Sequence, residues 1–142
     1  MANMAPGRGS GPSQTFTFNF TDTNGFANLG VMNILLNNFL DGRQACYLAY
    51  SRRFNLLYLV SDDGGGLLPG ASLNAPGSLS NSQCTVSWGA SPVAGSGNAL
   101  ALALNFGFSP GFAGNRVFYL AARDVNEGNN TDWQVKGSWT VQ

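Results

Sequence analysis

Hydrophobic and polar residues alternate through much of this chain. In residues 14–21, Phe16, Phe18 and Phe20 alternate with Thr and Asn, and the run ends at the turn signal Thr-Asn-Gly. Such alternation predicts a β-strand with one buried and one solvated face. We therefore expect the three rings to form half of a hydrophobic core.

Further alternating or apolar runs follow at short intervals, and each of them ends at a turn signal. They cover residues 29–38, 45–51, 56–61, 82–88, 98–108, 115–124 and 133–141. Short strands at this spacing are typical of a β-sandwich or a barrel. The pattern predicts an all-β domain of about eight or nine strands, in which two sheets bury their apolar faces against each other.

One segment also has an alternative interpretation. Residues 26–40 carry apolar side chains at helical spacing, but Gly30 and the β-branched Val31 and Ile34 favour a strand there. We predict a strand and keep a helix as the alternative.

The long segment 98–108 and the last segment show which side chains face inward. Leucine and phenylalanine share one parity in 98–108, with Ala or Gly mostly between them. In the last segment the residues of the apolar parity are Trp133, Val135, Trp139 and Val141. We expect both sets to build core, with Gly137 as a candidate bulge position.

The length of 142 residues fits one domain, preceded by a short tail. Residues 1–13 are rich in Gly, Pro and Ser, a composition that predicts a flexible linker, so the domain is expected over 14–142. No run of 18 apolar residues occurs, and the start lacks the apolar region of a signal peptide. A secreted parent would carry its export signal elsewhere, so we expect the chain to be part of a longer protein.

Composition narrows the function. Charged residues make up 10% of the chain against roughly 25% in an average protein, and seven basic side chains balance seven acidic ones. Without a basic cluster, nucleic acid and anionic membrane surfaces are not expected partners. The chain also has no histidine, the commonest general base and metal ligand. We expect no enzyme and no catalytic residue.

Two cysteines, Cys46 and Cys84, lie 38 positions apart in segments predicted as strands. A disulfide between them would stabilise the fold by about 4 kcal/mol on loop-entropy grounds. The alternative is a pair of buried free thiols. A disulfide would place the protein in an oxidising compartment, either extracellular or on the cell surface.

The segment LALNFGFSPGFAGNRVFYLAARDVNEGNNTDWQVKGSWTV resembles the closing strands of an immunoglobulin-like or fibronectin-type-III-like domain. Nearly the whole chain resembles an Ig-like repeat module of long secreted or surface-exposed bacterial proteins. The resemblance implies an Ig-like antiparallel sandwich and places Tyr119 at the tyrosine corner of such domains. Trp88 follows the second cysteine, and neither cysteine lies on the strand of Tyr119. We therefore do not expect the inter-sheet disulfide of antibody domains.

Two weak ligand sites can be named. Calcium binds carboxylate and amide oxygens, and the loop 123–132 offers Asp124, Asn126 and Asp132. A hairpin turn solvated by its own side chains is the alternative there, as it is at 22–24 and 62–63. Trp88 is the aromatic residue we would test for stacking on a sugar; the alternative is that it closes one end of the core.

These observations favour a non-catalytic structural or binding module, a spacer or adhesion unit of an extracellular bacterial protein. Its expected partners are neighbouring domains or copies of itself, and no cofactor is expected beyond possible calcium. One alternative is a carbohydrate-binding module that uses Trp88 and calcium. Another is a filament subunit that donates its first predicted strand, 14–21, to a neighbouring copy.

Overall fold

The computed structural model describes residues 2–38, 40–41, 43–124 and 133–141. Within them thirteen strands form two sheets that pack face to face, and there is no α-helix. The all-β sandwich is confirmed. The described strands exceed the eight or nine expected because several are only two to four residues long.

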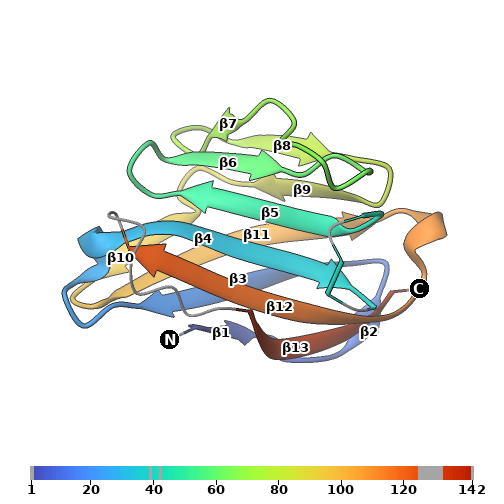
Figure 1. Cartoon of the computed structure of the whole chain (residues 1–142), viewed down its shortest axis with the longest axis horizontal. Helices are drawn as coiled ribbons and strands as arrows, with labels where there is room; N and C mark the ends of the chain where they lie inside the picture. The colour runs from blue at the N-terminus through green and yellow to red at the C-terminus, as the bar shows by residue number, and fades with distance from the viewer. Residues whose placement is uncertain (1, 39, 42, 125–132, 142) are drawn as a thin grey trace.

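The six strands of sheet A lie behind sheet B in Figure 1. In spatial order sheet A contains β1 (Ala2–Ala5), β3 (Ser13–Thr21), β11 (Ala99–Phe108), β9 (Cys84–Trp88) and β8 (Gly77–Ser80), and β10 (Val93–Ser96) also pairs with β11.

Sheet B has seven strands. Their order is β2 (Ser10–Gly11), β13 (Gln134–Val141), β12 (Gly114–Asp124), β4 (Leu29–Asn37), β5 (Cys46–Ser51), β6 (Leu56–Leu59) and β7 (Ala71–Ser72). Two short 3-10 turns, η1 (Phe26–Asn28) and η2 (Pro110–Phe112), precede β4 and β12. The segment with helical spacing is thus a strand, as predicted.

The strand order is that of a variable-type immunoglobulin sandwich. Strands β1, β3, β11 and β9 stand in the order A-B-E-D, and β13, β12, β4, β5 and β6 in the order G-F-C-C′-C″. Most neighbouring strands are antiparallel, and β2 alone among the described pairs runs parallel to its partner, β13. The Ig-like fold class is therefore confirmed.

The centre of the core is aromatic. Phe16, Phe18 and Phe20 are fully buried, as predicted. The ring of Phe16 lies 4.8 Å from that of Phe118 and 5.1 Å from that of Trp139, both across in sheet B. The leucine-lined β11 is a hydrogen-bonded neighbour of β3 in the same sheet. In antibody domains a disulfide joins strands B and F, whereas here aromatic packing links β3 to β12.

The N-terminal segment differs from the flexible linker expected over residues 1–13. Strand β1 pairs with β3 and buries Ala2 and Met4 in the core. The chain then crosses to sheet B, where Gly7 and Gly9 accept hydrogen bonds from the β13 backbone. A side chain on Gly9 would collide with the ring of Trp139. Gly9, one of the glycines that suggested a linker, therefore permits close packing of the chain on Trp139.

Replacing Met4 by Ala should lower the free energy of unfolding by about 2–3 kcal/mol, because it removes a thioether from the buried face of β1. Urea unfolding monitored by fluorescence gives this difference. The matched control is Asn3→Ala, which changes the exposed neighbour on the same strand and should stay within about 0.5 kcal/mol. Equal effects of the two variants would contradict a packed β1.

The inward parity predicted for the last strand holds only for its second half. Trp139 and Val141 are buried, but Val135 is 63% exposed. The register shifts where Phe118 and Tyr119 of β12 oppose Gly137 and Val135. A bulge adds one residue to β13 and reverses its inward and outward faces, so the inward orientation predicted for Val135 is wrong.

Candidate functional site

The predicted disulfide is present. Cys46 at the start of β5 and Cys84 at the start of β9 are bonded, with their Cα atoms 5.8 Å apart. Because β5 belongs to sheet B and β9 to sheet A, the bond joins the sheets. As expected, it is not the disulfide of antibody domains, because it joins the sheets at strands other than B and F. The bond indicates an oxidising, extracellular-type environment.

Trp88 does not offer a surface for a sugar. Its side chain is 6% exposed and belongs to the core, and its indole N–H donates to the carbonyl of Ala75 at 2.8 Å. The apolar ring therefore packs in the core, and the indole N–H already has a hydrogen-bond partner within the protein. The alternative, that Trp88 closes part of the core, describes its place in the structure.

The main calcium candidates cannot be placed. Asn126, Asp132 and the side chain of Asp124 lie outside the described residues. In the described part of the chain, no three acidic or cysteine residues gather as a metal site.

The two weaker calcium candidates act as turn residues. The carboxylate of Asp22 accepts hydrogen bonds from the Asn24 N–H and the Asn28 amide. That of Asp63 accepts from the Ser61 hydroxyl, which lowers its pKa most, and from the Gly65 N–H. Both carboxylates thus stabilise local turns.

Tyr119 does not occupy a tyrosine corner. It lies in the middle of β12, opposite Leu35 on one side and Val135 on the other. Its buried neighbours Phe118 and Leu120 have the opposite parity, so Tyr119 faces outward from the core. The corner implied by the resemblance is wrong for this residue, because it would require an inward position near the start of the strand.

The outer face of sheet B carries a small aromatic cluster. The rings of Tyr47 and Trp133 meet edge to face at 5.6 Å. Leu35 shares this outward parity yet is only 1% exposed, and its cross-strand partners are Tyr47 and Tyr119. Trp133, expected in the core, therefore packs against the opposite side of sheet B. Burial raises the pKa of Tyr47, and the charge of Arg123 acts in the opposite direction.

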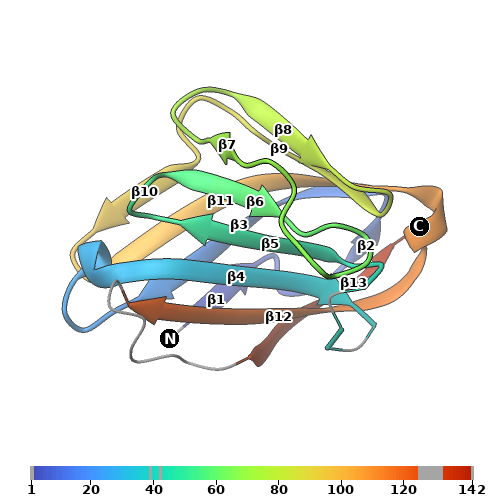
Figure 2. The same cartoon turned by 45° about the horizontal axis from the view of Figure 1, so that its top comes forward.

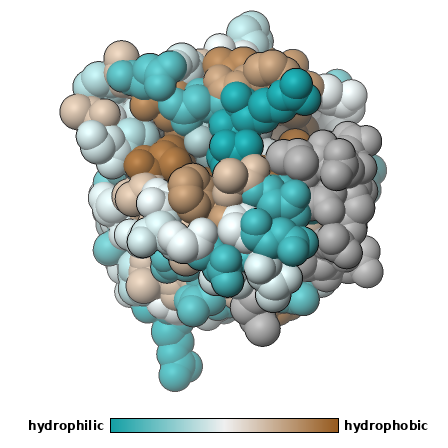
Figure 3. Space-filling view, turned by 90° about the vertical axis from the view of Figure 1, so that its left-hand side faces the viewer, coloured by the Kyte–Doolittle hydropathy of each residue, from teal (hydrophilic) through white to brown (hydrophobic). Residues whose placement is uncertain are grey.

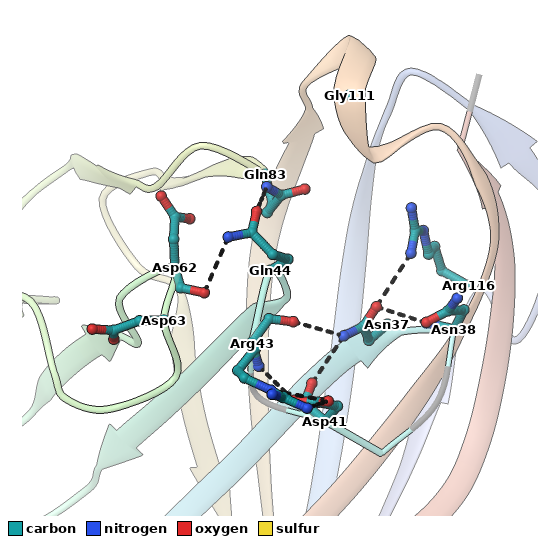
Figure 4. A pocket seen from close by; sticks show the side chains of 10 residues that line it. All are labelled: Asn37, Asn38, Asp41, Arg43, Gln44, Asp62, Asp63, Gln83, Gly111 and Arg116. Carbon is teal, nitrogen blue, oxygen red and sulfur yellow. Dashed lines mark hydrogen bonds and ion pairs between the residues drawn. The ribbon is translucent and has the colours of Figure 1, made fainter.

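A polar pocket of about 600 Å³ opens at the end of the sandwich that carries the disulfide. It lies where β4 ends and where β5, β9 and β12 begin (Figure 4). Among its lining residues are Asn37, Asp41, Gln44, Asp62, Gln83 and Arg116. We name this feature the end pocket.

Asn37 organises one wall of the end pocket. It is the buried polar residue of the described chain, at 4% exposure, and its amide donates to the carbonyls of Asp41 and Arg43 at 2.9 and 3.1 Å. Its side-chain oxygen accepts from the Asn38 N–H and from Arg116. Asn37 thus holds the β4–β5 connection against β12, and its own bonding capacity is filled.

Asp41 and Arg43 form an ion pair at the rim. The guanidinium contacts both carboxylate oxygens, with a shortest distance of 2.8 Å. The hydrogen bond from Arg43 is the main reason that the pKa of Asp41 falls to about 2. The pair therefore stays ionised above that pH, and each partner neutralises the other.

The opposite wall joins the two sheets through side-chain amides. Gln83 donates to the Gln44 side-chain oxygen at 2.7 Å, and the Gln44 N–H donates to the Asp62 carbonyl. One carboxylate oxygen of Asp62 accepts from the Ser82 N–H. Gln44 and Gln83 lie close in sequence to Cys46 and Cys84. The disulfide and the hydrogen bond between these two amides therefore join the two sheets at the same end of the sandwich.

Arg116 lies on the far side of the end pocket from Asp62 (Figure 4). It donates to the carbonyls of Phe112 and Ala113 and to the Asn37 side chain, at 3.0, 3.3 and 3.2 Å. Its guanidinium sits 4.0 Å from the centre of the Phe112 ring. Partial burial lowers the pKa of Arg116. Every hydrogen-bond partner found for this cation in the described residues is neutral.

Our sequence interpretation missed the end pocket. One signal was present: Arg116 shares its parity with the inward-facing Phe118 and Leu120, and a charged residue at an inward position needs partners. The other lining residues lie in turns and strand ends, where polar side chains are ordinary. Nothing in their local pattern indicates that they meet.

The opposite end of the sandwich carries the β3–β4 and β5–β6 connections, which correspond to antigen-binding loops in variable domains. Phe54, in the β5–β6 turn, is 65% exposed. Figure 3 faces this end and shows brown apolar patches separated by teal polar surface. The described surface there does not form one continuous apolar face.

No protein-family model matches the chain, and no curated protein matches it. The comparison with immunoglobulin domains therefore rests on strand order.

In the described residues, no helix is long and apolar enough to cross a membrane.

The end pocket offers fixed hydrogen-bond donors and acceptors, one ion pair and one cation with neutral partners. This arrangement is suited to binding a small polar molecule.

Proposed function

We propose that this chain is a non-catalytic structural module of a secreted or surface-exposed bacterial protein, where it spaces or presents neighbouring modules. The observation that carries the proposal is the position of its ends. Strand β1 begins in the left-hand part of the molecule, below β3, and β13 finishes near the right-hand end, so the two ends lie apart along the long axis in both views (Figures 1 and 2). Copies joined end to end can therefore extend without the chain turning back.

The construction of the domain supports a spacer role. Each sheet is pinned to the other by a disulfide and by an aromatic core, which resists separation of the layers. The balanced and sparse charge reduces electrostatic attraction or repulsion between adjacent copies. A stiff unit with little long-range interaction keeps the distance between its neighbours constant.

Small-angle X-ray scattering of one, two and three copies in tandem tests this function. A single copy should have a radius of gyration of about 14–15 Å, as expected for a compact domain of this length. Each added copy should lengthen the particle by a constant increment. Tandem copies that fold side by side into a compact particle would contradict a spacer.

The two alternatives have less support. Strand β3 is hydrogen-bonded to β1 on one side and to β11 on the other, so donating it to another chain would break both ladders. The buried ring of Trp88 lacks a free face for a sugar. Neither alternative is part of our proposal.

A further inference from the structure

We infer that the end pocket binds a saccharide bearing a carboxylate group, with Arg116 holding the carboxylate and Asp62 with Gln83 receiving hydroxyl groups across the pocket. This adds a ligand site to the structural role and does not depend on it. The inference rests on the distribution of used and unused polar groups around the cavity.

The anionic part of the ligand follows from Arg116. A guanidinium has five N–H donors, and Arg116 uses three of them on neutral oxygens. Two N–H groups have no hydrogen bond in the described structure, in a residue that lines the cavity. The Phe112 ring beneath the guanidinium limits hydration on one side. A carboxylate matches such a planar donor pair better than any neutral group does.

The carboxylates of the pocket itself do not fill this role. Asp41 is held by both nitrogens of the Arg43 fork. Asp62 and Asp63 lie across the pocket from Arg116 in Figure 4. The carboxylate of Asp62 accepts a hydrogen bond from Ser82, and that of Asp63 accepts from Ser61 and Gly65. A carboxylate partner for Arg116 would therefore come from outside the described chain.

The saccharide part follows from the opposite wall. There, one Asp62 oxygen and the Gln83 side-chain oxygen accept no hydrogen bond from the described residues. These two oxygens can accept hydrogen bonds from the hydroxyl groups of a ligand. A second anionic group on the ligand would be repelled by the Asp62 carboxylate. A sugar with one carboxylate presents both kinds of group on one ring. The volume of about 600 Å³ lies in the range of small-ligand pockets.

The pocket is arranged before any ligand enters. Asn37 fixes the position of Arg116, the Gln44–Gln83 hydrogen bond fixes the other wall, and the disulfide ties the strands beneath them. Binding would therefore require little ordering of side chains, which favours affinity.

The test is a titration followed by amide chemical shifts in ¹⁵N-labelled protein, with glucuronate, glucose, acetate and glycine as separate probes. Glucuronate should shift the signals of Asn38, Gln83 and Arg116 in the millimolar range, and the other three probes should bind at least tenfold more weakly. Equal responses to glucuronate and glucose would remove the role of the carboxylate, and equal responses to glucuronate and acetate would remove that of the sugar ring. Preference for glycine would indicate a zwitterion site instead, and no shift at these residues would overturn the inference.

Two variants connect binding to the proposed residues. Arg116→Lys keeps the charge but loses the planar fork, and it should weaken glucuronate binding at least tenfold. Its matched control is Arg53→Lys, which changes another arginine beside a phenylalanine ring, in the β5–β6 turn. The control should bind as the original protein does, and a tenfold loss there would contradict a site at Arg116.

Because Arg116 also supports η2, a second variant leaves its hydrogen bonds intact. Asn38→Asp introduces a negative charge of nearly the same shape beside Arg116, at an exposed side chain whose backbone N–H alone bonds to Asn37. It should weaken glucuronate binding several-fold, and the loss should shrink at high salt. Unchanged affinity in this variant would count against the assignment.

Discussion

Reduction of the Cys46–Cys84 disulfide should lower the free energy of unfolding by about 4 kcal/mol. The bond closes a loop of 38 residues, and the loss follows from the greater freedom of the reduced unfolded chain. Since small domains have total stabilities of about 5–15 kcal/mol, the reduced protein should be close to its stability limit. Urea unfolding with and without a phosphine reductant measures the difference.

A double replacement, Cys46→Ser with Cys84→Ser, should behave like the reduced protein or be less stable, because it places two hydroxyl groups in the core. The melting temperature of this variant should not respond to reductant, which makes it the control for side effects of the reagent. An unfolding midpoint of the original protein that reductant leaves unchanged would contradict a stabilising inter-sheet bond.

The second large effect is expected at the aromatic centre. Phe16→Ala should cost about 3–5 kcal/mol, because it removes a fully buried ring that touches Phe118 and Trp139 in the opposite sheet. Chemical denaturation gives the value. Phe54→Ala is the matched control, since that ring is 65% exposed and its loss should change stability by no more than about 0.5 kcal/mol.

A loss at Phe16 as small as that at Phe54 would mean that the aromatic packing between β3 and β12 does not link the sheets. The comparison is informative because the deleted groups are chemically identical and only their surroundings differ.

Alternation predicted the strands that have one buried and one solvated face over many residues. Phe16, Phe18 and Phe20 are the clearest case, and the strand at Ile34 was preferred correctly over a helix. The alternation pattern failed where the alternating run is short or is interrupted by a bulge. Only Ala2 and Met4 alternate inward in β1, too few to stand out from a glycine-rich tail.

The orientation of the last strand shows a second limit. Parity counted back from Trp139 predicts an inward Val135, but one extra residue in the bulge reverses it. Gly137 was identified as a candidate bulge position, yet a glycine alone does not specify where the register shifts. That depends on the partner strand β12, which is not visible in the local pattern.

The end pocket could not be predicted, because it is assembled by long-range pairing. Asn37 lies in β4 and Arg116 in β12 of sheet B, whereas Gln83 directly precedes β9 of sheet A, and the three meet only once the strand order is known. The partners of the disulfide were predictable because only one pairing of two cysteines exists, whereas the local pattern left two free thiols as the alternative. Trp88, in contrast, was considered for a ligand because its position near a loop suggested exposure, and the long-range packing over Gly77 buries it.

The parallel pairing of β2 with β13 determines how the domain would respond to tension. In a string of modules pulled from both ends, β2 is drawn toward the preceding module and β13 toward the following one. The two strands would then have to slide along each other, so their backbone hydrogen bonds share the load instead of opening one after another. A pull on the N-terminal side reaches the pairing of β1 with β3 first, and the hydrogen bonds that the carbonyls of Gly7 and Gly9 accept from β13 resist the force next.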